Sequence, residues 1–312
     1  MTNASMIVIG LIQAVLLLLV APLFSGFSRV LRAKMHNRRG PSIFQNYRDL
    51  AKLMKRQEVV SKQTSWVFRA TPYVIMVSML LIVMIVPVFT NQSPFGWVGD
   101  LILVVYLFAL GRFFFALSGL ETGSTFGGIG ARRELLLSVL IEPIVLLVLF
   151  VMALLAGSTN LGTISSKIAT GQTPYYTSVW LGMLAFAFGA FAEMGKLPFD
   201  VAEAEQELQE GPLTEYSGTS LAMMKWGLYL KQVVVVALFL AVFLPFGSMT
   251  ELSLPSALLA VVAFFLKAIF FFVVIAIFEN SMARIRYMKV STVTWAALGA
   301  AVLSFVFYLA NV

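Results

Sequence analysis

The sequence contains no cysteine and a single histidine, His36, and this excludes most metal chemistry at the outset. Iron–sulfur clusters need thiolates, and zinc sites want several Cys or His residues. His36 stands in the basic stretch AKMHNRRG, away from any apolar pocket, and makes a poor haem ligand. We therefore expect no catalytic, cofactor-binding or metal-ligating residue here, so electrons should move through another polypeptide.

Charge is also scarce. Charged residues make up 12% of the 312 residues and hydrophobic residues 60%, whereas ordinary globular domains are about one-quarter charged. Stretches of about 20 apolar residues recur, which is the length that crosses hydrocarbon as a helix. The composition predicts an all-α, polytopic membrane helix bundle that forms one domain over residues 1–312. The net charge of +7 then indicates membrane topology rather than nucleic-acid binding.

The apolar runs predict eight transmembrane spans. They cover roughly residues 6–29, 71–90, 100–120, 134–156, 178–196, 226–246, 256–279 and 291–310. Lys and Arg gather in every second connection, which predicts cytoplasmic loops at 30–70, 121–133, 197–225 and 280–290. Both termini are then periplasmic, and we expect a multi-pass protein of the bacterial inner membrane.

Acidic residues are concentrated in EMGKLPFDVAEAEQELQEGPLTEYSG, residues 193–218, called here the acidic segment. It holds seven of the fifteen acidic residues: Glu193, Asp200, Glu203, Glu205, Glu207, Glu210 and Glu215. Good helix formers between Pro198 and Gly211 predict a helix. Its spacing would put four carboxylates on one side: Asp200, Glu203, Glu207 and Glu210. Such a stripe needs water, a basic partner or partial protonation, because like charges one turn apart repel.

Two interpretations of the acidic segment stay open. It is either a solvated acidic loop, or a packed segment whose carboxylates exchange protons near neutral pH because crowding raises their pKa. The interleaved apolar residues, together with Tyr216, favour packing: Leu197, Phe199, Val201 and Leu208.

Several ionisable groups fall inside the predicted spans, where charges are costly and usually paired or functional. They are Arg112, Glu142, Lys231, Lys267 and Glu193. Arg112 and Glu142 lie at similar depth and could pair, either as a structural ion pair or as a proton relay. Lys267 has no obvious partner, which favours a functional role. Together these groups could form a polar file that runs from the acidic segment into the membrane.

The first predicted cytoplasmic loop contains RAKMHNRRGPSIFQNYRDLAKLMKRQE, residues 32–58, called here the basic loop. Apolar residues recur at helical spacing between basic ones: Ile43, Tyr47, Leu50 and Met54. This pattern predicts an amphipathic helix at the membrane interface. Anionic lipid accounts for the charges alone. A docking surface for a soluble partner also accounts for Arg39, Gly40, Pro41, Gln45, Asp49 and Lys52, and the acidic segment could be its complement.

The chain resembles the complex I subunit 1 family. The resemblance rests on Glu193-x-x-Lys196-x-Pro198-Phe199-Asp200, on Glu203-Ala204-Glu205-x-Glu207-Leu208 with Gly211, on Glu215-Tyr216-Ser217-Gly218, and on Arg39-Gly40-Pro41…Gln45…Asp49…Lys52. It extends over nearly the whole chain. HNRRGP, YRDLAKLMKRQE, ETGSTFGGIGARRE and FENSMAR are similar to the hydrogenase branch, the membrane subunits of formate hydrogenlyase and hydrogenase-4 complexes.

The resemblance implies a non-catalytic membrane subunit that anchors a [NiFe]-hydrogenase arm at the cytoplasmic face and could couple its chemistry to proton movement. Implied partners are the hydrogenase large and small subunits, an iron–sulfur protein and antiporter-like membrane subunits, with the iron–sulfur clusters and NiFe centre in those partners. The acidic segment, with Lys196 and Tyr216, would lie at the junction. The alternative is a quinone-binding subunit of a proton-pumping NADH dehydrogenase-like complex, although quinone enzymes usually have Arg at the position of Lys196. A free-standing transporter is a third class.

Overall fold

The computed structural model describes residues 3–61, 64–172, 176–250 and 253–310, and these residues form helices and loops without a strand. Seven helices in this part of the chain are long and apolar enough to cross a membrane. They are α1 (Asn3–Met35), α3 (Trp66–Ile85), α4 (Leu101–Glu121), α5 (Thr125–Ala156), α9 (Gly218–Phe243), α10 (Leu254–Ser281) and α11 (Tyr287–Leu309). The apolar α7 (Thr177–Glu193) is shorter, so about eight spans are confirmed.

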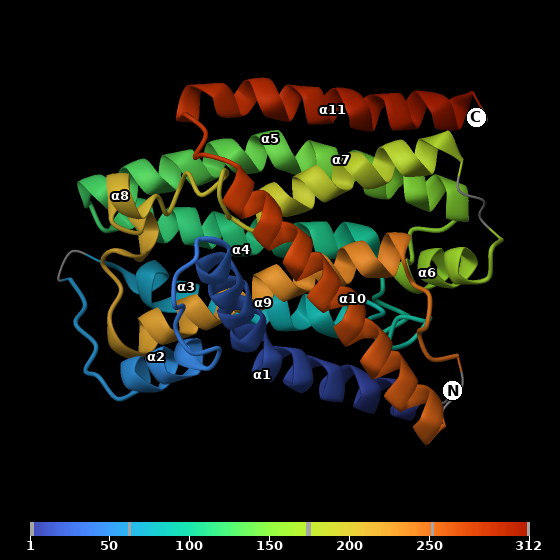
Figure 1. Cartoon of the computed structure of the whole chain (residues 1–312), viewed down its shortest axis with the longest axis horizontal. Helices are drawn as coiled ribbons and strands as arrows, with labels where there is room; N and C mark the ends of the chain where they lie inside the picture. Colours follow the sequence, from blue (N-terminus) through green and yellow to red (C-terminus); the bar gives the residue numbers. More distant parts are fainter. Residues whose placement is uncertain (1–2, 62–63, 173–175, 251–252, 311–312) are drawn as a thin grey trace.

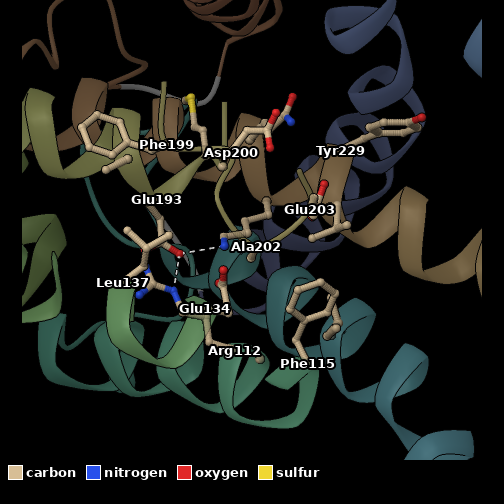
Figure 2. Close-up of a pocket in the computed structure, with 18 of the residues that line it drawn as sticks. Arg112, Phe115, Glu134, Leu137, Glu193, Phe199, Asp200, Ala202, Glu203 and Tyr229 are labelled. Carbon is tan, nitrogen blue, oxygen red and sulfur yellow. Dashed lines mark hydrogen bonds and ion pairs between the residues drawn. The ribbon is translucent and has the colours of Figure 1, made fainter. Parts of the chain in front are cut away.

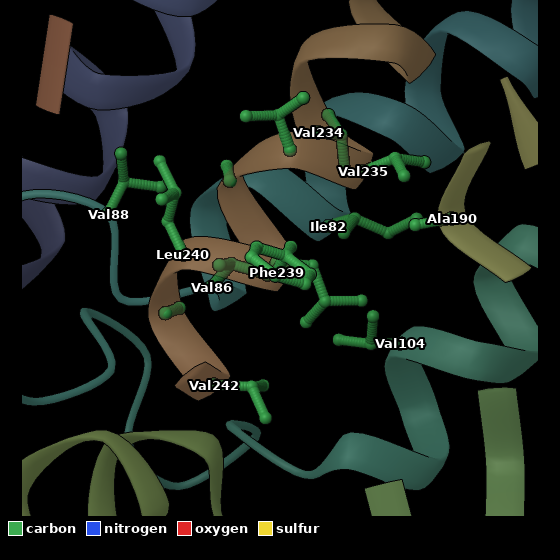
Figure 3. Packing of buried hydrophobic residues seen from close by; sticks show 14 of the residues in the cluster. Ile82, Val86, Val88, Val104, Ala190, Val234, Val235, Phe239, Leu240 and Val242 are labelled. Carbon is green, nitrogen blue, oxygen red and sulfur yellow. The ribbon is translucent and has the colours of Figure 1, made fainter. Parts of the chain in front are cut away.

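The centre of the bundle is α9, whose second half is buried on all sides. Its valines and Phe239 pack against Ile82 of α3, Val104 of α4 and Ala190 of α7 (Figure 3). Because this half of α9 is buried on all sides, it has no face left for lipid and forms the core around which the other helices pack. The outermost helices are α10, which packs on α1 and α9, and α11, which packs on α5 and α7 (Figure 1).

Proline shapes α1 near its middle. Pro22 lies inside the helix, where its ring removes a backbone hydrogen bond and bends the axis. The carbonyl of Leu18 accepts a hydrogen bond from the Trp226 indole at 2.8 Å. The carbonyl of Pro22 accepts one from the Asn46 amide at 3.1 Å. These bonds attach α9 and the short helix α2 (Gln45–Met54) to the bend in α1.

The helices extend further than the apolar runs that predicted them. Parts of the predicted loops 121–133 and 197–225 are helical, because α5 already starts at Thr125 and α9 at Gly218. Similarly, α1 continues to Met35 and α10 to Ser281. Hydropathy marks only the part of a helix that lies in hydrocarbon, whereas caps such as Ser124 mark where the helix begins. The predicted second span, 71–90, is shifted as a whole, because α3 begins at Trp66 and ends before Pro87.

Figure 1 shows the two chain termini at one end of the bundle and the short helices α2 and α8 (Glu205–Leu208) at the other. The helix α6 (Leu161–Ala169), which the sequence pattern did not predict, lies at the end with the termini. The basic loop and the acidic segment therefore share one end of the molecule. Whether that end is cytoplasmic stays a prediction.

Candidate functional site

The acidic segment does not form the predicted helix. Only α8 and a single 3-10 turn, η1 (Gly211–Leu213), are helical between Pro198 and Gly218. Asp200 and Glu203 stand in irregular chain, while Gln209 and Glu210 adopt positive φ, so the four carboxylates do not share a helix face. Like charges at helical spacing oppose helix formation, and separate basic partners stabilise the irregular path instead.

Three carboxylates of the acidic segment have cationic partners on three other elements. Arg284, after α10, lies 2.7 Å from Asp200. Arg133 of α5 lies 2.8 Å from Glu207. Lys225 of α9 lies 3.1 Å from Glu210. None of the three cations belongs to the basic loop. The partners instead fasten the segment across the end of the bundle.

A buried ion cluster lies directly beneath the acidic segment. Arg112 of α4 donates through Nε to Glu193 at 2.9 Å and contacts the same carboxylate with a second guanidinium nitrogen. Its Nη1 donates to Ser138 at 2.9 Å and lies 3.6 Å from Glu142. Lys231 of α9 lies 3.0 Å from Glu193 on the other side. The predicted Arg112–Glu142 pair is thus confirmed, but Glu193 is the nearer partner.

A cavity of about 330 Å³ opens beside this cluster. Its lining includes Glu193 and four further acidic residues, Glu134, Asp200, Glu203 and Glu210, together with Arg29, Arg32, Arg112, Lys225 and Lys231. Figure 2 shows Glu134, Glu193 and Glu203 around the same space. Within the described part of the chain, no hydrogen bond or ion pair engages the Glu134 or Glu203 carboxyl group.

The environment of Glu203 strongly disfavours its charged form. Desolvation by burial raises its pKa to about 8, and nearby Glu134, Asp200 and Glu210 act in the same direction, against Lys231. Glu203 therefore holds its proton at neutral pH but can release it to a somewhat stronger base. This is the behaviour expected of a group that exchanges protons.

Glu134 is a site residue that the sequence pattern did not bring out. It stands four residues before Ser138 and eight before Glu142, so the three side chains lie on one face of α5. That face meets Arg112 and the cavity. The signal was present in the sequence as GARRELLLSVLIEP, a polar residue at every fourth position. It was hidden because residues 121–133 were predicted to be a loop, which left Glu134 at the boundary of a span.

Lys196 belongs to a second buried network, on the other side of the turn that ends α7. It lies 3.6 Å from Glu279 of α10, and its Nζ is 3.4 Å from the Ser28 hydroxyl of α1. Glu279 also pairs with Arg32 of α1 at 2.6 Å. Burial lowers the pKa of Lys196, although Glu279 opposes this. Neither Glu279 nor Arg32 was predicted as a site residue.

Lys267 does not join the polar file that was predicted for it. Its ammonium donates to the carbonyl oxygens of Leu244 and Phe246 at 2.8 and 2.9 Å, just beyond the C-terminus of α9. Leu244 comes 13 residues after Lys231, and 13 residues extend over about 20 Å in a helix. The partners that the sequence could not reveal are backbone carbonyls, which stabilise a cation at a helix C-terminus.

The remaining predicted residues of the acidic segment differ in exposure. Tyr216 is buried, stacks on Phe68 and donates to the Phe68 carbonyl at 2.8 Å. Burial raises its pKa to about 12, so it stays protonated and acts as a packing anchor. Glu215 is exposed. The side chain of Glu205 lies outside the described residues.

The predicted amphipathic helix of the basic loop is confirmed as α2. Leu50 and Asn46 are buried, and the helix packs on α1 and α9. Gln45 donates to Asp49 at 2.8 Å, so these two side chains pair along the helix. Lys52 is exposed on the outer face, and Arg39, Gly40 and Pro41 lie in the chain before the helix.

No group of three or more His, Asp or Glu side chains within the described ranges could hold a metal ion. The site presents carboxyl, ammonium and guanidinium groups around a polar cavity. Such an arrangement can hold protons, transfer them between carboxyl groups, and stabilise the resulting charges.

Comparison with known proteins places the chain among membrane subunits of redox complexes. The NADH dehydrogenase family model matches residues 7–310. Hydrogenase-4 component C of Escherichia coli (strain K12) is 54% identical over 304 residues, covering 97% of this chain and 96% of the relative. Formate hydrogenlyase subunit 4 of the same organism is 52% identical, covering 96% and 98%. A subunit of the NADH-quinone oxidoreductase of Methylococcus capsulatus is 29% identical, covering 84% and 81%.

A solved structure shows the same fold. A chain of the membrane-bound sulfane sulfur reductase, an archaeal respiratory membrane complex, superposes with a TM-score of 0.87 at 21% identity, covering 97% of this chain and 99% of the other. With its apolar helices, this chain is a multi-pass protein of the inner membrane. It belongs to the NADH dehydrogenase subunit 1 family, together with hydrogenase-4 component C and formate hydrogenlyase subunit 4.

Proposed function

We propose that this chain is the membrane subunit that anchors a [NiFe]-hydrogenase arm at the cytoplasmic face, and that its carboxylate cavity exchanges protons with that arm. The two relatives that are 54% and 52% identical are components of hydrogenase-4 and formate hydrogenlyase, which supports the first half. The second half rests on the cavity. Hydrogen evolution combines two protons with two electrons, so its site needs a proton supply.

The cavity carries this proposal because it combines room, polarity and a protonated acid. A volume of about 330 Å³ accommodates several waters beside Glu203, whose pKa of about 8 keeps it protonated at pH 7. Glu134 lines the same space, and Glu193 connects it to Arg112, Glu142 and Lys231. Protons can therefore pass between carboxyl groups and water at one end of the bundle.

In this proposal the partner subunits carry the redox centres, and this chain anchors them to the membrane. The hydrogenase large and small subunits and an iron–sulfur protein would carry the NiFe centre and the clusters and dock on the end that presents α2 and the acidic segment. Antiporter-like membrane subunits would pack beside the bundle. The exposed basic residues of the basic loop, including Arg39 and Lys52, would contact the soluble arm.

Substitutions within the acidic segment test the proposal. Glu203→Gln keeps the shape of the side chain but cannot release a proton, so formate-dependent hydrogen evolution should fall at least tenfold. Adding Glu207→Gln should lower it little further, because Glu207 is half exposed and already paired with Arg133. Glu215→Gln is the matched control, since Glu215 is exposed in the same segment. Hydrogen production should be measured in membranes that contain equal amounts of the chain.

Unchanged hydrogen production in the Glu203→Gln, Glu207→Gln double variant would remove these residues from the mechanism. Identification of the companions of the chain in mild detergent tests the anchoring role separately. A hydrogenase large subunit among the companions supports the anchoring role. NADH-oxidising polypeptides, or a quinone photo-label bound to the complex, would replace it with the quinone-binding alternative.

A further inference from the structure

Three exposed side chains follow one stripe at the start of α3. Trp66, Arg69 and Tyr73 are spaced three and four residues apart, so they lie on the same face of the helix. Trp66 is 69% exposed, Tyr73 is 58% exposed, and Arg69 is exposed between them. Phe68 points the other way and stacks on Tyr216 of the acidic segment. These three residues, called here the α3 stripe, therefore face the outside of the bundle.

The length of α3 fixes the depth of the α3 stripe. The helix has 20 residues, which extend over about 30 Å, the thickness of the hydrocarbon core. Arg69 is three residues after Trp66, or about 4.5 Å further into the membrane, and Tyr73 is about 10 Å further than Trp66. The guanidinium of Arg69 is thus positioned where the lipid headgroups meet the hydrocarbon.

The hydrogen-bond donors of the α3 stripe are free within the part of the chain that the structure describes. No ion pair or hydrogen bond there engages the Arg69 guanidinium, the Trp66 indole or the Tyr73 hydroxyl. By contrast, Arg133 and Lys225, near the same end of the bundle, pair with carboxylates of the acidic segment. A guanidinium presents five N–H groups, and at a membrane surface the phosphate and ester oxygens of lipids are the acceptors at hand.

The surface below the α3 stripe is apolar. Val77 and Leu81 continue the same face toward the middle of the membrane and are 52% and 41% exposed. From its start inward, this face of α3 therefore presents a cation flanked by two aromatic donors and then hydrocarbon side chains. A phospholipid has the complementary order, with an anionic phosphate, then ester groups, then acyl chains.

We propose that the α3 stripe binds an anionic phospholipid of the bilayer. Arg69 pairs with the phosphate, for which a guanidinium offers two parallel N–H groups. The Trp66 indole and the Tyr73 hydroxyl donate to the remaining headgroup and ester oxygens, and the acyl chains lie along Val77 and Leu81. A neighbouring protein helix would satisfy Arg69 only with an acid at this depth, whereas an anionic lipid always supplies one. The site does not depend on which soluble arm the chain anchors.

Native mass spectrometry of the purified complex tests the lipid site. The complex in mild detergent is mixed with phosphatidylglycerol or, separately, with phosphatidylcholine of the same acyl chains. The parent should retain phosphatidylglycerol in preference, and Arg69→Gln should lower its retention at least fivefold. Arg132→Gln is the matched control, because Arg132 is exposed near the start of α5 without an aromatic residue three or four positions further along the helix. Its retention should stay within twofold of the parent.

Two further variants separate a built site from general attraction to charge. Trp66→Phe and Tyr73→Phe keep the rings but remove one donor each, and each should lower retention two- to threefold. Equal losses in Arg69→Gln and Arg132→Gln would overturn the proposal, because they would reduce it to the net charge of the surface. Retention of phosphatidylcholine that equals that of phosphatidylglycerol in the parent would overturn it as well.

Photo-crosslinking tests the occupant in native membranes without disturbing the α3 stripe. A benzophenone amino acid replaces Val77, whose side chain is half exposed. After irradiation, the adduct should be with phospholipid, and phosphatidylglycerol or another anionic lipid should exceed its share of the membrane at least threefold. An adduct with a partner polypeptide, or with a second copy of this chain, would assign this face of α3 to a protein interface and overturn the proposal.

Discussion

Individual carboxylates in the acidic segment have different roles, and their partners decide which. Asp200, Glu207 and Glu210 each face one cation and serve to fasten the chain. Glu193 sits between Arg112 and Lys231 and pairs with both cations. Glu203 alone of these five has no such pair in the described structure, and burial leaves it protonated at neutral pH. A count of acidic residues could not separate these roles, because all the partners come from other segments of the chain.

The raised pKa of Glu203 predicts a pH-dependent stability. Between its ordinary pKa of about 4.5 and its folded value of about 8, the folded chain retains a proton that the unfolded chain releases. Glu203 therefore destabilises the protein increasingly as the pH rises from about 4.5 to 8, and by a constant amount above that. Glu203→Gln removes this cost. Its melting temperature in detergent should exceed that of the parent chain by a margin that grows from pH 5 to pH 8.

Glu207→Gln serves as the control for this measurement, because Glu207 lies in the same segment, is half exposed and does not line the cavity. Melting curves of the Glu203→Gln variant and the parent that coincide at pH 8.5 would contradict the assigned pKa. An increase in stability combined with a loss of hydrogen evolution would identify Glu203 as a group retained for function at a cost to the fold.

Among the elements, α2 was predictable and the structure of the acidic segment was not. The apolar period of α2 reflects burial of Leu50 against α1 and α9, so its sequence alone specifies the helix. The acidic segment has strong helix formers between Pro198 and Gly211, yet forms only the four-residue α8. Its conformation is set by Arg133, Lys225 and Arg284, which are distant in sequence. Tertiary contacts of this kind override local propensity.

The exposed face of α2 should bind the soluble arm through charge. Lys52 and Lys55 are exposed there, while Leu50 holds the helix in place from the opposite face. Replacing both by Glu should lower the amount of soluble partner recovered with the chain at least several-fold and leave its amount in the membrane unchanged. The same charge reversal at exposed Lys289 is the control. Recovery that is equal in both variants would assign the basic face to lipid instead.

At the scale of the whole molecule, the arrangement of helices places the termini away from the basic loop and the acidic segment (Figure 1). The distribution of Lys and Arg predicts that the termini are periplasmic. The number and approximate position of the spans could be read from hydropathy, since each span must cross the same hydrocarbon. The cavity of about 330 Å³ could not, because its lining comes from α1, α3, α4, α5, α7, α9 and the acidic segment, and hydropathy does not specify how these pack together.

Orientation can be measured directly because the chain has no cysteine. Single cysteines are introduced at exposed His36, in the basic loop, and at exposed Ala310, near the C-terminus. A membrane-impermeant maleimide should label Ala310→Cys in intact spheroplasts and His36→Cys only in inverted vesicles. The reverse pattern would place the acidic segment on the periplasmic side and would remove the basis for docking a cytoplasmic arm.

One turn of chain ties the two buried networks to each other. Glu193, in the cluster around Arg112, and Lys196, in the contact with Glu279 and Arg32, are three residues apart at the end of α7. A shift of this turn by an ångström strains contacts with α4 and α9 on one side and with α1 and α10 on the other. The ion pairs of Glu193 with α4 and α9 are thus mechanically coupled to the contact between α1 and α10.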